Sequence, residues 1–84
     1  MESLRSRLKK CQPYFIKRDL IPKMFFKIDD NYTENLIFEY TFLNHLSDLS
    51  ISVRMGYSRQ TIGYKLNNII KKNHAIIEEF LANN

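Results

Sequence analysis

Apolar residues in the C-terminal half of the chain recur every three or four positions, which is the spacing of one face of an α-helix. The stripe consists of Ile62, Leu66, Ile69, Asn73, Ile76 and Phe80. Only one of these six positions is polar, and the opposite face carries polar and basic residues. The pattern predicts one long C-terminal helix with a buried side.

A second stretch, near residues 33 to 46, has the same helical periodicity. Its apolar face consists of Leu36, Ile37, Tyr40, Leu43 and Leu46, and Phe38 and Phe42 extend it. The stretch contains Glu39 but no Lys or Arg. We expect it to be a scaffold helix that contributes most of its apolar side chains to the core.

The first third of the chain predicts two shorter helices. Leu4, Leu8 and Cys11 can share one face of the first helix. Pro13 suits the first turn of the second, since its missing N–H has no intrahelical partner there. Pro22 is expected to end that helix.

Two short helices joined by a tight turn are predicted between these longer patterns. Ile51 and Met55, four positions apart, can face one interior. Gly56 follows, where a chain often adopts the left-handed conformation that glycine takes without strain. Tyr57 can fill the angle between the helices, and Ser58 can cap the second one. This pattern fits both a helix-turn-helix and an ordinary helical hairpin.

The predicted fold is all-α: a compact domain of four to five helices with a helix-turn-helix and a long C-terminal helix. A length of 84 residues allows one domain, and two Gly and two Pro are few enough to favour helices. Ser47 or Asp48 is expected to cap the first helix of the pair. The expected parts are basic, aromatic-rich N-terminal helices (1–28), the scaffold helix (33–46), the helix-turn-helix (47–72) and an extension of the last helix (73–84).

Charge is distributed in blocks along the chain, whose net charge is +4 at pH 7. Residues 1–27 carry +6, residues 28–50 carry −5, residues 51–73 carry +5, and the remainder carries −2. The basic block from Arg54 to Lys72 coincides with the helix-turn-helix, where a DNA-binding helix needs cations for phosphate contacts. The alternative is a solvated helix face without a ligand.

The run LSDLSISVRMGYSRQTIGYKL resembles the helix-turn-helix of sigma-factor region four and of small phage late-gene activators of the RinA and ArpU type. In that group a GYSRxT element opens the recognition helix. The resemblance covers residues 44 to 72, about a third of the chain. It implies a regulator that presents a helix to double-stranded DNA, encoded by a phage or mobile element. Ser52 stands where the group usually has Ala, and Lys65 stands where an apolar residue is common.

The outer face of the second helix of the pair carries polar side chains able to bind bases and phosphates. Gln60 and Tyr64 are expected to reach base edges, and the neighbouring basic residues to contact phosphates without reading sequence. Ser58 lies beside the helix N-terminus, which favours a phosphate. The predicted DNA-binding residues are Arg54, Ser58, Arg59, Gln60, Thr61, Tyr64, Lys65, Asn67, Asn68, Lys71 and Lys72.

The stripe of the C-terminal helix alternates steps of four and three, as a heptad seam does. A single Asn in such a seam can pair with its copy across a two-fold axis, which predicts a homodimer. The alternative is that the seam packs against the chain's own helix-turn-helix. The predicted dimer or partner interface consists of Ile70, Asn73, Ile76, Ile77 and Phe80.

A second function fits the aromatic residues of the N-terminal region. Tyr14, Phe15, Phe25 and Phe26 lie beside basic residues, and such aromatics make good interface anchors. They favour a protein-binding adaptor or inhibitor that docks on RNA polymerase or another nucleoprotein complex. The alternative is that they belong to the core of a small domain.

The remaining chemistry of the sequence does not predict an enzyme, a cofactor or a metal. Cys11, His45 and His74 are widely separated and lack the spacing of metal ligands. The single cysteine excludes an internal disulfide and fits a reducing cytoplasm, where the chain would associate with the nucleoid when bound to DNA. No apolar run approaches the roughly 20 residues that span a bilayer.

Overall fold

A computed structural model describes residues 2–26 and 31–83 of the chain. Their elements are α1 (Leu4–Lys9), α2 (Pro13–Phe15), a π-helical turn (Ile16–Leu20), a 3-10 turn (Ile21–Lys23), α3 (Asn31–Phe42), α4 (Asp48–Met55), α5 (Arg59–Lys72) and α6 (His74–Ala82). None of the described residues forms a strand. The all-α prediction is confirmed, with six α-helices instead of four to five.

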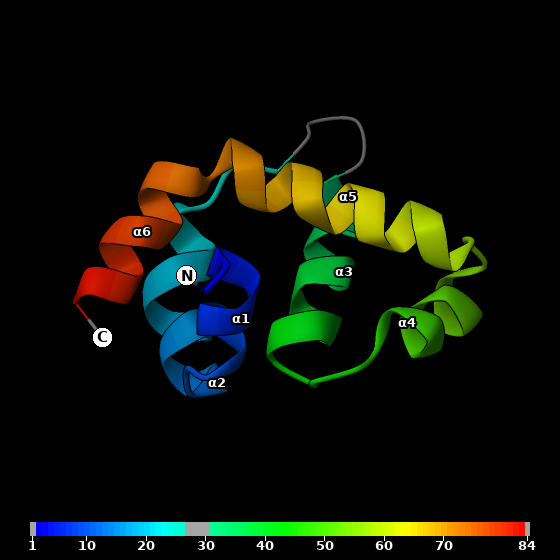
Figure 1. The fold of residues 1–84 in the computed structure, drawn as a ribbon, viewed down its shortest axis with the longest axis horizontal. Coiled ribbons are helices and arrows are strands. Elements are labelled where there is room, and N and C mark those ends of the chain that lie inside the picture. Colours follow the sequence, from blue (N-terminus) through cyan, green and yellow to red (C-terminus); the bar gives the residue numbers. More distant parts are fainter. Residues whose placement is uncertain (1, 27–30, 84) are drawn as a thin grey trace.

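Helix α5 is the longest element and lies across the others (Figure 1). Helices α3 and α4 pack against it, and α6 turns away from its C-terminal end toward the N-terminal helices. Helix α1 packs on both α3 and α6. One long helix is therefore held from beneath by elements of both halves of the chain.

The second N-terminal helix begins at the predicted proline, Pro13, but it does not end at Pro22 as predicted. Pro13 occupies the first turn of α2 as predicted, and Ser3 caps α1 by accepting a hydrogen bond from Ser6 N–H at 3.1 Å. Pro22 does not end the helical winding. A 3-10 turn includes it, and the backbone becomes extended at Met24.

The core lies between α5 and the helices beneath it. The apolar residues with no exposed surface are Leu8, Ile16, Leu20, Ile37, Phe38, Phe42, Ile51, Ile62, Leu66 and Ile77. The rings of Phe38 and Phe42, 4.7 Å apart between centroids, occupy its centre. These two were predicted only to extend the face of the scaffold helix, whereas Leu36 and Leu43 are half-buried at its edge. The buried face of α3 is therefore rotated from the predicted one.

The single long C-terminal helix is a wrong prediction, because the helix breaks at Asn73. This residue has φ −107° and ψ 23°, and it separates α5 from α6. Its side chain is 1% exposed. Its Oδ1 accepts a hydrogen bond from Phe25 N–H at 2.6 Å, and its Nδ2 donates to the Phe25 and Ile69 carbonyls at 2.8 and 2.9 Å.

This break changes the reading of the predicted dimer interface. Asn73, which was expected to pair with a second copy, uses its amide inside the chain. Ile70, Ile77 and Phe80 are buried in the same core, and Ile76 is half-buried against it. The alternative was packing against the chain's own helix-turn-helix; helix α6, which carries Ile76, Ile77 and Phe80, instead packs on α1 and the π-helical turn as well as on α5.

Candidate nucleic-acid interface

Helices α4 and α5 each start at a predicted capping residue. Ser47 caps α4 by accepting a hydrogen bond from Ser50 N–H at 3.1 Å. Gly56 is left-handed, with φ 78°, and its N–H donates to the Ser52 carbonyl at 2.9 Å. Ser58 then caps α5 by accepting from Thr61 N–H at 3.1 Å. These local hydrogen bonds fix where α4 stops and where α5 starts.

The two helices pack on each other and on α3 through a small shared core. Ile51 of α4 and Ile62 of α5 are fully buried, and Met55 is half-buried beside them. Ser52 satisfies its hydroxyl within its own helix by donating to the Leu49 carbonyl at 2.7 Å. A polar residue is therefore accommodated where the resembling group has Ala.

A close approach between the two helices occurs at Gly63 of α5. A Cβ atom there would lie 3.6 Å from Oδ2 of Asp48, in the first turn of α4. The other carboxylate oxygen of Asp48 accepts a hydrogen bond from Arg5 Nη2 at 2.8 Å. Helix α1 is thereby linked to the start of α4, a contact that the sequence did not reveal.

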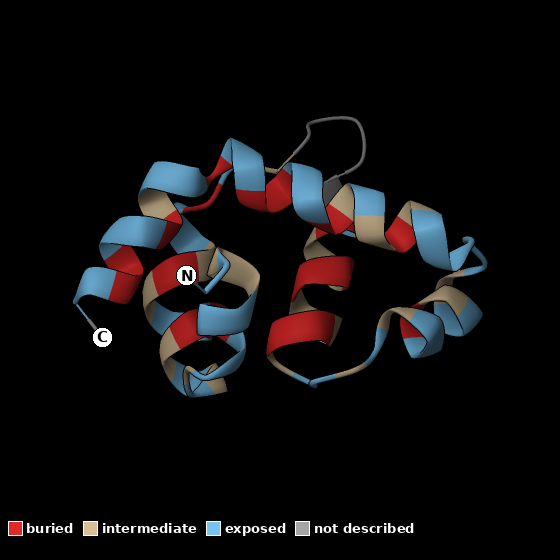
Figure 2. Cartoon of the chain, in the orientation of Figure 1, coloured by how far each residue is buried: buried red, intermediate tan, exposed pale blue. Residues whose placement is uncertain are grey.

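The outer side of α5 is open to solvent. Figure 2 shows its exposed residues on the side away from α3 and its buried residues on the side facing α3. Gln60, Tyr64, Asn67 and Lys71 are all exposed, and Tyr64 is 69% exposed. At about 1.5 Å of rise per residue they form a stripe roughly 16 Å long. We call these four residues the outer stripe.

The other predicted DNA-binding residues surround this stripe with varied exposure. Ser58, Arg59, Asn68 and Lys72 are exposed, and Thr61 is half-buried. All of them belong to α5 or to the turn that precedes it. The structure therefore brings these five and the outer stripe together on one helix.

Lys65 and Arg54 lie differently from the rest. The ammonium of Lys65 is 5.4 Å from the centre of the Tyr57 ring. Tyr57, which was predicted to fill the angle between the helices, is 38% exposed. Arg54 is exposed, with its guanidinium 5.8 Å from the Tyr40 ring of α3 and not against α5.

A buried carboxylate borders one side of α5. Glu34, in the first turn of α3, is 8% exposed. It lines a cavity of about 370 Å³ together with Tyr64, Lys65, Asn68 and Lys72. Periodicity within α3 could not have found this neighbour, because it depends on how α3 packs against α5.

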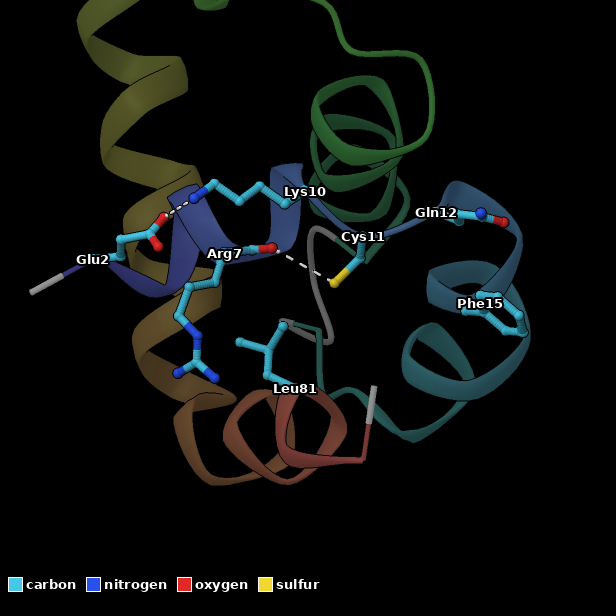
Figure 3. Close-up of a pocket in the computed structure, with 7 residues that line it drawn as sticks. All are labelled: Glu2, Arg7, Lys10, Cys11, Gln12, Phe15 and Leu81. Atoms are coloured by element: carbon cyan, nitrogen blue, oxygen red, sulfur yellow. Dashed lines mark hydrogen bonds and ion pairs between the residues drawn. The ribbon is translucent and has the colours of Figure 1, made fainter.

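A second cavity, of about 440 Å³, lies between α1, α2 and α6, away from α5 (Figure 3). It is lined by Glu2, Arg7, Lys10, Cys11, Gln12, Phe15 and Leu81. Lys10 pairs with Glu2 at 2.6 Å. Burial raises the pKa of the Cys11 thiol, and the opposing effect of Arg7 is smaller. The thiol is therefore protonated at neutral pH and a weak nucleophile.

Among the described residues, 2–26 and 31–83, no three His, Cys, Asp or Glu side chains are grouped to hold a metal ion. No helix in that part of the chain is long and apolar enough to cross a membrane.

Comparison with known proteins adds no relative. No protein-family model, curated protein or solved structure matches the chain.

Proposed function

We propose that this chain is a small sequence-specific DNA-binding transcriptional regulator that uses α4 and α5 as a helix-turn-helix. The observation that carries the proposal is the outer stripe. Four long polar or basic side chains stand exposed along a helix whose opposite face is buried. A helix of this width fits the major groove of B-DNA, and α4 and α3 support it from behind.

Different side chains of α5 would contact the bases and the phosphates of the DNA. Gln60 can pair with an adenine edge through its amide, and the Tyr64 hydroxyl can bind a base or phosphate. Arg59, Asn67 and Asn68 lie where bases and phosphates are both within reach. Ser58 and Thr61 lie at the helix N-terminus, where N–H groups favour a phosphate.

Lysines at the other end of α5 supply affinity without sequence preference. Lys71 and Lys72 are exposed in its last turn. Each phosphate contact releases a counterion, so such lysines make binding salt-dependent.

Binding of two point variants to duplex DNA tests the proposal. Lys71→Ala should weaken binding to every duplex and flatten the slope of log affinity against log salt by about one unit. Gln60→Ala should instead change sequence preference. Lys17→Ala is the matched control, since Lys17 is exposed on the N-terminal helices. If both α5 variants bind like the control, α5 is not the recognition helix.

A second candidate function is a protein-binding adaptor that docks on RNA polymerase, and Phe25 favours it. The Phe25 ring is 63% exposed although its backbone is held by two hydrogen bonds to Asn73. An exposed aromatic ring on a fixed backbone can bind a partner with little loss of backbone conformational entropy.

Binding of purified RNA polymerase to the full chain tests the adaptor. Phe25→Ala should weaken that binding at least about tenfold if the ring is a hot spot. Tyr32→Ala, which removes a ring that is 76% exposed on α3, should leave it unchanged. Equal effects of the two substitutions would count against Phe25 as an anchor.

A further inference from the structure

Glu34 is a carboxylate buried among side chains that the proposed function assigns to DNA. It comes from α3, yet it lines the same cavity as Lys65, Asn68 and Lys72 of α5. Its 8% exposure leaves little water to screen its charge. A phosphate that approaches this side of α5 meets a negative charge beside the two lysines.

The two sides of α5 are consequently unequal. Lys71 belongs to the outer stripe and does not line the cavity that contains Glu34, whereas Lys65 and Lys72 do. The repulsion between Glu34 and phosphate opposes the attraction of the nearby lysines. This opposition reduces affinity most in complexes that depend on phosphate contacts alone, namely those with DNA of arbitrary sequence.

We infer that Glu34 is a specificity-determining residue, which suppresses non-specific DNA binding by opposing phosphate contacts on the side of α5 that carries Lys65 and Lys72. The inference rests on the proposed function. Base contacts by Gln60, which does not line this cavity, are unaffected by it, so they contribute a larger share of the binding. Glu34 acts by charge and contacts no base.

Neutralising this charge is the direct experiment. Fluorescence anisotropy would measure binding of the full chain to a selected duplex and to a scrambled one over a range of salt concentrations. Glu34→Gln should bind the scrambled duplex about three- to tenfold more tightly, as expected for the removal of one negative charge near phosphates. Its affinity for the selected duplex should rise less than about twofold, so the specificity ratio falls.

Glu39→Gln is the matched control, because it removes the same charge from the same helix. Glu39 lines a different cavity, with Pro13, Tyr14, Lys17, Leu36, Tyr40, Leu43 and Asn44, that includes no residue of α5. Equal tightening by Glu34→Gln and Glu39→Gln would mean that only net charge matters, and would overturn the inference. Glu34→Asp keeps the charge and should retain the original specificity ratio; a ratio as low as that of Glu34→Gln would also overturn it.

The variants Lys71→Ala and Lys72→Ala test the inference without altering Glu34. Lys72→Ala should cost less than half the loss in affinity for scrambled DNA that Lys71→Ala costs, because Glu34 already opposes Lys72. Equal losses would overturn the inference even if Glu34→Gln did not fold. Failure of the unaltered chain to bind any duplex refutes the proposed function and this inference together, whereas binding with equal lysine effects refutes the inference alone.

Discussion

Replacement of Asn73 by Ala tests how the two halves of the chain are joined. The Asn73 amide is buried at the α5–α6 junction and binds both backbone polar groups of Phe25, 48 positions away in sequence. Asn73→Ala removes both bonds and leaves the N–H and carbonyl of Phe25 without these partners; it also removes the bond to the Ile69 carbonyl, which keeps the N–H of residue 73 as a donor. The variant should remain helical but unfold far more easily.

The magnitude follows from the two bonds to Phe25. Each neutral hydrogen bond stabilises a fold by about 1 kcal/mol net, and each buried group left unpaired costs about 1–3 kcal/mol. The Phe25 backbone is only partly buried, so water can reach it and the lower end of that range applies. We expect a loss of about 2–4 kcal/mol, reduced by a few tenths because Ala favours helix. At about 4–8 °C per kcal/mol, Tm should fall by roughly 8–30 °C.

Urea and thermal unfolding followed by circular dichroism measure this loss. Asn68→Ala is the control, since Asn68 is exposed on the same helix and should change stability by less than about 0.5 kcal/mol. Asn73→Asp keeps an acceptor for Phe25 N–H but turns a carboxylate toward the Phe25 carbonyl, so it should destabilise at least as much as Ala. Equal stability of Asn73→Ala and Asn68→Ala would refute the proposed role of the Asn73–Phe25 hydrogen bonds.

Three other perturbations have expected outcomes. Gly56→Ala should cost about 1–2 kcal/mol in urea unfolding, because a Cβ there meets no atom within 4 Å and only the left-handed backbone is strained; an unchanged midpoint would contradict this. Ile77→Asp should abolish folding, as followed by circular dichroism, since Ile77 has no exposed surface. Ile76 is half-buried, so Ile76→Asp should fold and sediment with the same mass as the unaltered chain; a lower mass would support the predicted dimer interface. Alkylation of Cys11 at pH 7.5 should be slower than that of an unfolded chain, because its raised pKa leaves less thiolate; equal rates would contradict the raised pKa.

Features set by neighbouring residues were predictable from the sequence. The caps at Ser47 and Ser58 and the left-handed turn at Gly56 each depend on residues within about one helical turn. The buried stripe of α5, which includes Ile62 and Leu66, follows from helical periodicity alone. These features define the α4–turn–α5 pair, and the exposed side of α5 follows from them.

Features set by packing between distant segments were not predictable. Asn73 was placed correctly on the buried stripe, but spacing cannot show that Phe25 would pass beside it and satisfy its amide. The position of Glu34 against α5 and the pairing of Arg5 with Asp48 likewise depend on the angles between helices. A helical pattern gives the buried side of a helix, not the residue that covers it.

Selection of bound sequences from a random DNA pool by the purified full chain, at one defined salt concentration, shows whether α5 recognises a DNA sequence. We expect enrichment of a short motif, and enrichment of a different motif when the selection is repeated with the Gln60→Ala variant. Absence of enrichment, or the same motif with Gln60→Ala and with every other outer-stripe variant, would contradict recognition of DNA by α5.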